Sequence, residues 1–295
     1  MALDNELQKT KRNLSDFYDI TVKVLDYLPI VINDTKTKNY YQISSSTIAG
    51  TKKYLRPVNK KLFIENSAEF KKKVEGFKAI LKKIKNRELN FSIDEKTLIN
   101  SVTYTIQQSI GLGFDLLVNP NSARKHVGNR FEELIRCIFS EIGVANKRTV
   151  LQIPYETEQG IKIYKCENDL ILSPFNEVKS TAKHLDKNEI VVSAKTSSKD
   201  RMGKMFIDKM LLERFVKHEQ KVIGIFLNDV QRKSDNNISY TLVSGLFMVY
   251  TSFLTQLEGI YYLDPPPNIF KEPFSKHMGL FSDLLTKDLW TLLAS

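Results

Sequence analysis

Three acidic residues and one lysine could together bind a metal ion and a phosphate group. Asp169 begins the apolar run DLILS, Lys195 ends the apolar run EIVVSAK, and Asp208 lies in the helical pattern that follows. Glu132 lies upstream, in the helical pattern NRFEELIRCIFSEIG. Magnesium prefers oxygen ligands and usually takes only one or two protein carboxylates, which leaves positions for phosphate and water. An aspartate that begins one strand and a lysine that ends its neighbour would suit such a site.

The helix around Glu132 has two adjacent glutamates with different surroundings. Its apolar stripe consists of Phe131, Leu134, Ile135, Ile138, Phe139 and Ile142. Successive helical residues are rotated by about 100°, so Glu132 borders this stripe while Glu133 faces solvent. We therefore expect Glu132 to be the acid that lies near a buried site.

Each charged residue taken singly also has a structural explanation. Asp169 follows Asn168 and could be a turn residue, and Lys195 could protect an edge strand from aggregation. Asp208 is next to apolar helical neighbours, so it needs a partner, and an ordinary salt bridge would serve as well as a metal. Only the four residues together favour a catalytic role over a structural one.

The surrounding pattern predicts two parts of different character. Residues 1–120 are expected to be a mainly helical, basic region for DNA binding or dimerisation, and residues 121–295 a catalytic core. In the first part we expect helices at 14–28, ended by Pro29, from 69 to 84 and at 94–110, with irregular structure at 30–66 and a break at Gly113, Pro120 and Asn121. In the second part we expect strands at 161–165, 169–173, 189–195, 222–227 and 259–263, and helices at 202–217 and 246–257, which indicates an α/β or α+β core.

Composition narrows the class of partner. The chain is 42% apolar and carries a net charge of +10, which excludes a mainly disordered protein and favours a polyanionic partner, either nucleic acid or an anionic membrane. Residues 52–88 hold 13 Lys/Arg and 4 Asp/Glu, although a solvated helix face would have the same composition. The scattered cysteines and histidines lack metal-ligand spacing. Because we see no secretory signal and no membrane span, we expect a cytoplasmic protein.

The stretch from Ser193 to Arg201, with the sequence SAKTSSKDR, resembles the type II restriction endonucleases of the PD-(D/E)xK group that cut CCGG, CCNGG and CCWGG sites. Several of these enzymes take their second acid from the following helix, where Asp208 lies, and Ser193 occupies the position that this acid leaves. Their upstream Phe-Glu acid corresponds to Phe131-Glu132. The resemblance covers about residues 124 to 210, and this chain differs in having Lys199 where arginine is usual and Asp208 where glutamate is usual.

The resemblance implies a fold, a cofactor and roles for these residues. It implies a central mixed β-sheet flanked by helices, with Mg²⁺ held by Asp169 and Asp208. Lys195 would orient or deprotonate the attacking water, and Glu132 would be an outer or second-metal acid.

Lys199, Asp200 and Arg201 would read G·C pairs, because lysine and arginine donate to guanine and aspartate accepts from cytosine. A charged helix start capped by Asp200 is the alternative. The partner would be double-stranded DNA, and a palindromic site would imply a homodimer. A structure-specific repair nuclease and a non-catalytic nucleic-acid-binding protein remain alternatives.

Overall fold

A mixed six-stranded sheet forms the centre of the second half of the chain. The computed structural model describes residues 2–48, 50–198, 201–234, 237–240, 242 and 244–294. The strand order is β12-β11-β8-β7-β6-β5. The bounds are β5 Ala145–Thr157, β6 Gly160–Ser173, β7 Ile190–Ser197, β8 Lys221–Asn228, β11 Gly259–Asp264 and β12 Met278–Leu280. Strands β5, β6 and β7 are antiparallel neighbours, whereas β7, β8, β11 and β12 are parallel.

The parallel strands bring polar residues to one edge of the sheet. Ser197 of β7 and Asp264 of β11 both pair with Asn228 of β8, so these three strands end at the same level. Ligands of open α/β sheets bind outside the carboxyl ends of parallel strands. We therefore expect a ligand-binding site at this carboxyl edge.

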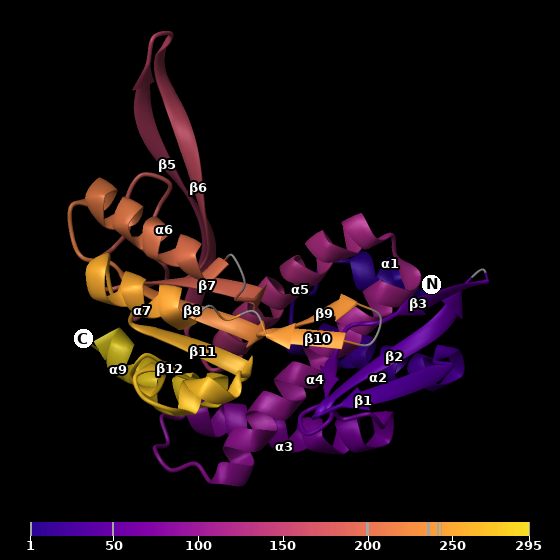
Figure 1. Ribbon diagram of the computed structural model, residues 1–295. Helices are drawn as coiled ribbons and strands as arrows, with labels where there is room; N and C mark the ends of the chain where they lie inside the picture. Colours follow the sequence, from indigo (N-terminus) through magenta and orange to yellow (C-terminus); the bar gives the residue numbers. More distant parts are fainter. Residues whose placement is uncertain are drawn as a thin grey trace.

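Helices cover both faces of the sheet (Figure 1). Helix α5 (Pro120–Glu141) packs on one face, where Leu170, Val192 and Ala194 share a hydrophobic cluster with its apolar stripe. Helices α6 (Arg201–Val216) and α7 (Ser244–Phe253) cover the other face, where Ile171 and Val191 cluster with Phe206 and Phe247. Alternate residues of a strand point to opposite faces, which is why a strand covered on both faces appears in the sequence as a continuous apolar run.

Four helices build the first part of the chain: α1 Leu3–Gln8, α2 Leu14–Val31, α3 Ser67–Lys85 and α4 Ile93–Leu117. Asn13, Asn66 and Ser92 cap three of them by accepting hydrogen bonds from backbone N–H groups. Two predicted helix ends are wrong. Pro29 lies inside α2, whose last turn survives because Ile32 N still donates to Leu28 O. Gly113 does not end α4 but lets Leu7 pack closely, since a Cβ there would lie 2.8 Å from Leu7 Cδ1.

The expectation of irregular structure at 30–66 is also wrong. This segment contains a small antiparallel sheet of β1 Asp34–Lys38, β2 Tyr41–Ile48, β3 Thr51–Tyr54 and β4 Val58–Asn59. In the central strand β2, Tyr41, Ile43 and Ser45 are buried in alternation. Only two of those three residues are apolar, so the sequence gives a weak strand pattern.

The remaining elements connect or complete these layers. They are β9 Val230–Ser234, β10 Asn237–Tyr240, the 3₁₀ helices η1 Pro267–Phe270 and η2 Phe274–Lys276, α8 Phe281–Asp283, the π-helix η3 Leu284–Asp288, and α9 Leu289–Ala294. The predicted boundary after residue 120 falls at the first residue of α5, and one hydrophobic cluster extends from Leu7 to Leu289 across it. Among the described helices, none is long and apolar enough to cross a membrane.

Candidate active site

Three of the predicted site residues meet at the carboxyl edge of β7. The ammonium group of Lys195 on β7 donates to Asp169 Oδ2 on β6 and lies 3.4 Å from Glu132 Oε1 on α5. The side chains of Lys195, Glu132 and Asp169 are 21%, 20% and 13% exposed. Two carboxylates and an amine are therefore held together where solvent can still reach them.

An irregularity in β6 presents Asp169 to the neighbouring strand. The β5–β6 register shifts from Lys147↔Ile171 to Thr149↔Asn168, so β6 has one extra residue, a β-bulge, at Asp169 and Leu170. Bulges redirect side chains and are frequent beside active sites. Asp169 Oδ2 also accepts a hydrogen bond of 3.0 Å from Ala194 N, the residue before the lysine, which fixes the carboxylate against β7.

Helix α5 brings Glu132 to the same point. Its neighbours Phe131 and Leu134 are fully buried against the sheet, whereas Glu132 is partly exposed at the border. Glu133 points elsewhere and forms an ion pair of 2.7 Å with Arg130 while accepting from Lys11 N. The expectation that Glu133 faces solvent is wrong, because its side chain is 17% exposed and that of Glu132 is 20% exposed; the two differ in their partners, Arg130 for Glu133 and Lys195 for Glu132.

The charges at this point favour an additional cation. Burial raises the pKa of Glu132, and the nearby negative charge of Asp169 raises it further, while Lys195 acts in the opposite direction. Two carboxylates sharing one ammonium group keep an excess of negative charge. A hard divalent ion with oxygen ligands fits this donor set, because magnesium is usually held by one or two protein carboxylates.

Asp208 lies apart from these three residues. It is on α6, where both its carboxylate oxygens lie 2.6 Å from Lys204 Nζ one helical turn earlier. Over the described ranges, no hydrogen bond or ion pair joins Asp208 to Asp169 or Lys195, and no three His, Cys, Asp or Glu side chains are grouped for a metal ion. Its role as a metal ligand stays a prediction that requires Asp208 to leave Lys204.

Of the three predicted base-reading residues, the structure describes Arg201, the first residue of α6. Arg201 is exposed, and its backbone N donates to Ser198 O at 2.8 Å. Lys199 and Asp200 lie outside the described residues.

A buried anchor just before this segment was missed at the level of sequence. The hydroxyl of Ser198 donates to Asp229 Oδ1, and Tyr262 OH donates to Asp229 Oδ2 at 3.1 Å. Ser198 and Asp229 are 1% and 0% exposed. The available signal was the pair Asn228-Asp229, two polar residues that directly follow the apolar run of β8.

A second buried carboxylate joins the carboxyl edge to the small sheet. Asp264, at the end of β11, accepts hydrogen bonds from Tyr41 OH at 3.1 Å and from Asn59 Nδ2 at 2.7 Å. Burial raises the pKa of Asp264 to about 6, although these donors act to lower it. Since both oxygens of Asp264 have partners, this group has a structural role.

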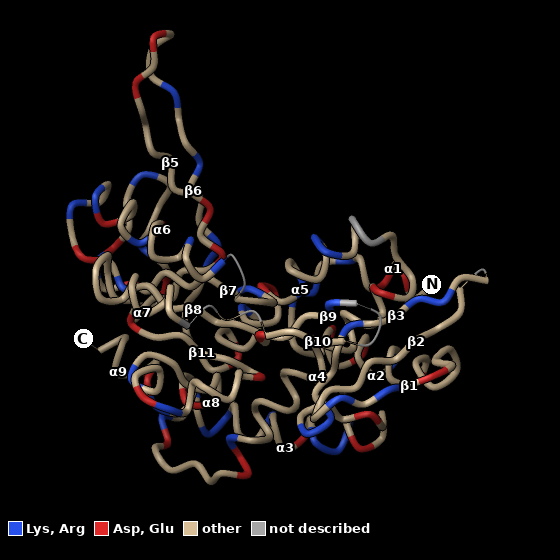
Figure 2. The backbone as a smooth tube through the Cα atoms, in the orientation of Figure 1, with Lys and Arg blue, Asp and Glu red and all other residues tan. Residues whose placement is uncertain are grey.

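The second half of the lysine-rich segment forms α3, with lysines on its outer face. Several of its lysines form ion pairs along the helix or with the next one, as in Lys73–Glu69, Lys78–Glu75 and Lys83–Glu95. Lys71, Lys72, Lys82 and Lys85 are exposed. The tube view shows both signs of charge around α3 (Figure 2), so acids neutralise part of this cationic face.

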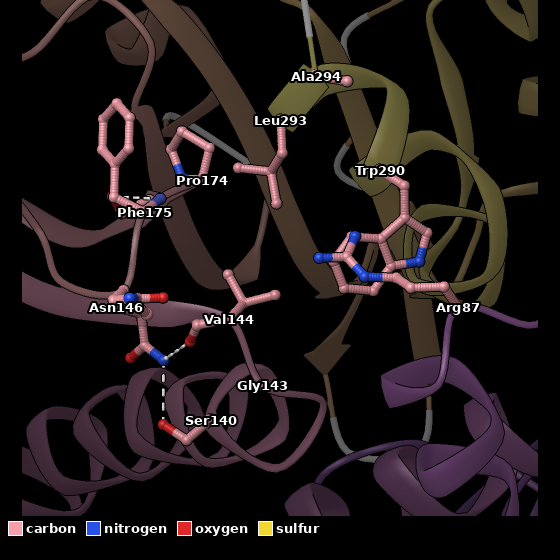
Figure 3. A pocket seen from close by; sticks show the side chains of 13 residues that line it. Arg87, Ser140, Gly143, Val144, Asn146, Pro174, Phe175, Trp290, Leu293 and Ala294 are labelled. Carbon is pink, nitrogen blue, oxygen red and sulfur yellow. Dashed lines mark hydrogen bonds between the residues drawn. The ribbon is translucent and has the colours of Figure 1, made fainter.

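A cavity of about 570 Å³ lies away from the predicted site residues. It is lined by Arg87, Asn146, Phe175 and Trp290 among others, and the Arg87 guanidinium lies 3.3 Å from the centre of the Trp290 ring (Figure 3). None of its lining residues is one of the predicted catalytic or base-reading residues. We therefore assign it no part in the candidate active site.

Comparisons with known proteins agree with this fold. No family model matches the chain, and no curated protein is similar to it in sequence. The crystal structure of the type IIP restriction endonuclease Kpn2I superposes with a TM-score of 0.70 at 16% identity, covering 95% of this chain and 91% of that one. The restriction endonuclease PspGI in complex with substrate DNA gives a TM-score of 0.43 at 10% identity, covering 76% of this chain and 93% of that one. The predicted mixed sheet flanked by helices is confirmed, and the chain has a restriction-endonuclease-like fold.

Proposed function

We propose that this protein is a type II restriction endonuclease that cuts both strands of DNA at a short palindromic site containing G·C pairs, of the CCGG, CCNGG or CCWGG type. The observation that supports this proposal most directly is the meeting of Lys195, Asp169 and Glu132 at the carboxyl edge of β7. A nuclease needs carboxylates for a metal and a cation for the phosphate, and these residues supply both.

The roles of the residues follow from their positions. Asp169 and Glu132 would hold Mg²⁺, with Asp208 as a further proposed ligand once it leaves Lys204. Bound Mg²⁺ would polarise the scissile phosphate and lower the pKa of water. The ammonium group of Lys195 would orient the attacking water and stabilise the negative charge that develops on the phosphate. Asp169 would keep Lys195 in place by the hydrogen bond that already joins them.

Sequence recognition is proposed for Lys199, Asp200 and Arg201, which follow β7 in the chain after Ser198. The residue before this segment, Ser198, is held in the core by Asp229, so phosphate binding at Lys195 and base reading at Arg201 would be mechanically linked. Arginine and lysine bind guanine O6 and N7, and aspartate accepts from cytosine N4, which suits adjacent G·C pairs.

The proposed partners are double-stranded DNA and a second copy of the chain. A palindromic site has a twofold axis, and a twofold dimer would place one catalytic cluster on each strand. The net charge of +10 favours association with DNA.

Incubating the pure protein with phage DNA, with and without Mg²⁺, tests the proposal. We expect discrete fragments that appear only with the divalent ion. A smear, or cutting restricted to branched DNA, would instead indicate a structure-specific repair nuclease. DNA that is bound but stays intact in Mg²⁺ would indicate a non-catalytic DNA-binding protein.

A further inference from the structure

The long hairpin of β5 and β6 extends beyond the rest of the molecule (Figure 1). Strand β7 pairs with β6 only at Leu170–Leu172, and β5 is the last strand of the sheet. The outer part of the hairpin, residues 154–164, is called the arm below. Its two strands pair only with each other over the described residues. An isolated two-stranded ribbon is at best marginally stable in water, so the arm needs further contacts.

Both faces of the arm carry exposed apolar side chains. Pro154 pairs with Ile163 and Glu156 with Ile161, so the two isoleucines share one face, where they are 55% and 75% exposed. Tyr155 and Tyr164 lie on the opposite face and are 48% and 46% exposed. A long ribbon with free edges and exposed β-branched and aromatic residues invites association with another chain.

The charge of the arm is unsuited to DNA. It contains Glu156, Glu158 and Lys162, a net charge of −1, whereas the whole chain carries +10 and the remainder therefore +11. Acidic positions lie at the end of the arm (Figure 2). Proteins that bind DNA electrostatically neutralise phosphates with lysine and arginine. The apolar, slightly acidic arm is instead complementary to a protein of positive net charge, and a second copy of this chain, at +10, is one.

We propose that the arm is the dimerisation element, which docks on a second copy of this chain and sets the distance between two catalytic clusters. This inference rests on the proposed function for its second part, because only cutting of both strands requires two clusters. Asp169 and Ile161 lie on the same strand, β6. At about 3.3 Å per residue, the docked isoleucine lies roughly 26 Å from the catalytic aspartate. A continuous strand would transmit any shift of the docked arm to the site.

Sedimentation velocity of the full chain without DNA tests the arm. We expect a wild-type dimer, and an Ile161→Lys/Ile163→Lys variant whose dimer dissociation constant is at least about 100-fold weaker. The matched control is Leu89→Lys/Ile93→Lys, which changes two apolar residues outside the arm that are more exposed than the two isoleucines, at 82% and 83%. It should remain dimeric. A second variant, in which residues 155–162 are replaced by an Asn-Gly turn, removes the arm while keeping Pro154 beside Ile163.

The outcomes separate this inference from the proposed function. A monomeric wild type, or arm variants that dimerise as tightly as the wild type, would overturn the dimerisation role. Arm variants that keep their dimers but lose affinity for DNA would overturn it too, by assigning the arm to DNA. Arm-dependent dimers that cut no DNA in Mg²⁺ would reject the nuclease and retain the dimerisation element.

Discussion

Two kinds of carboxylate stand at the same edge of the sheet. At the ends of β8 and β11, Asp229 and Asp264 are 0% and 2% exposed, and each accepts hydrogen bonds on both oxygens from hydroxyl or amide groups. Near the end of β7, Asp169 and Glu132 remain partly exposed and share a single lysine.

The difference between the two sets lies in what remains available to a ligand. A fully buried carboxylate whose two oxygens both accept hydrogen bonds from the protein stabilises the fold and is closed to a ligand from solvent. Carboxylates that share one ammonium group keep free lone pairs and excess negative charge. The edge is therefore divided between a closed, structural part and an open part suited to chemistry.

The open part should be essential for cleavage. We expect Asp169→Asn and Lys195→Ala each to lower the cleavage rate at least about 10³-fold, since the first removes a proposed metal ligand and the second the cation beside the reacting phosphate. DNA binding in Ca²⁺ should be largely retained. Cleavage rates under single-turnover conditions measure the effect.

The control for Lys195→Ala is Lys187→Ala, which removes an exposed lysine before the start of β7. This control should cut at the wild-type rate. If Asp169→Asn or Lys195→Ala also cuts at nearly that rate, the site is misassigned.

The sequence predicts the open part of the edge better than the closed part, because hydrogen-bond partners from separate strands leave no local pattern. Lys195 and Asp169 could be identified because the first ends an apolar run and the second begins one, and Glu132 because it borders a helical stripe. The anchor of Ser198, Asp229 and Tyr262 could not, because its three residues come from three separate strands or their ends. The network of Asp264 with Tyr41 and Asn59 joins residues more than 200 positions apart.

The fold shows the same limit. Strands buried on both faces have unmistakable apolar runs, as in β7 and β8, and were predicted. Strand β2, with serines on its buried face, and β5, which leaves the core beyond Ile153, have no such run. Both strands pair with neighbours in the chain, β2 with β1 and β3 and β5 with β6, so cross-strand pairing specifies them without an apolar run.

The closed part should control stability rather than rate, and Asp264 gives it a pH dependence. Its folded pKa of about 6 lies above the ordinary value of 3.8, so the folded state holds this proton more tightly. Protonated Asp264 therefore stabilises the folded state below about pH 4, and this stabilisation is lost as the pH rises through 6. One pKa unit corresponds to about 1.4 kcal/mol, so the free energy of unfolding falls by about 3 kcal/mol.

Asp264→Asn cannot titrate, so it isolates this contribution. Between about pH 4 and pH 7, the unfolding free energy of the variant relative to the wild type should shift by about 3 kcal/mol in favour of the variant. Urea unfolding of both proteins across this range measures the shift. Parallel curves for the two proteins would contradict a raised pKa at Asp264.

A substitution of Asp208 tests whether this third carboxylate joins the open catalytic part or stays on α6. As a metal ligand it should matter for cleavage, and we expect Asp208→Asn to lower the rate about 10²-fold. The control Glu219→Gln neutralises an exposed acid just after α6 and should leave the rate unchanged. A wild-type rate for Asp208→Asn would leave Asp169 and Glu132 as the metal ligands.

The smallest effect is expected at Lys204, whose side chain is 61% exposed and pairs with Asp208. Exposed ion pairs of this kind contribute little, so Lys204→Ala should change the unfolding free energy by less than about 0.5 kcal/mol. The cleavage assay is more informative, because Lys204 and a metal would compete for the same carboxylate. If Asp208 leaves the lysine to bind Mg²⁺, removing the lysine should lower the Mg²⁺ concentration for half-maximal cleavage about threefold. An unchanged Mg²⁺ requirement would mean that Asp208 stays on the surface of α6, and that the open part of the edge consists of Lys195, Asp169 and Glu132.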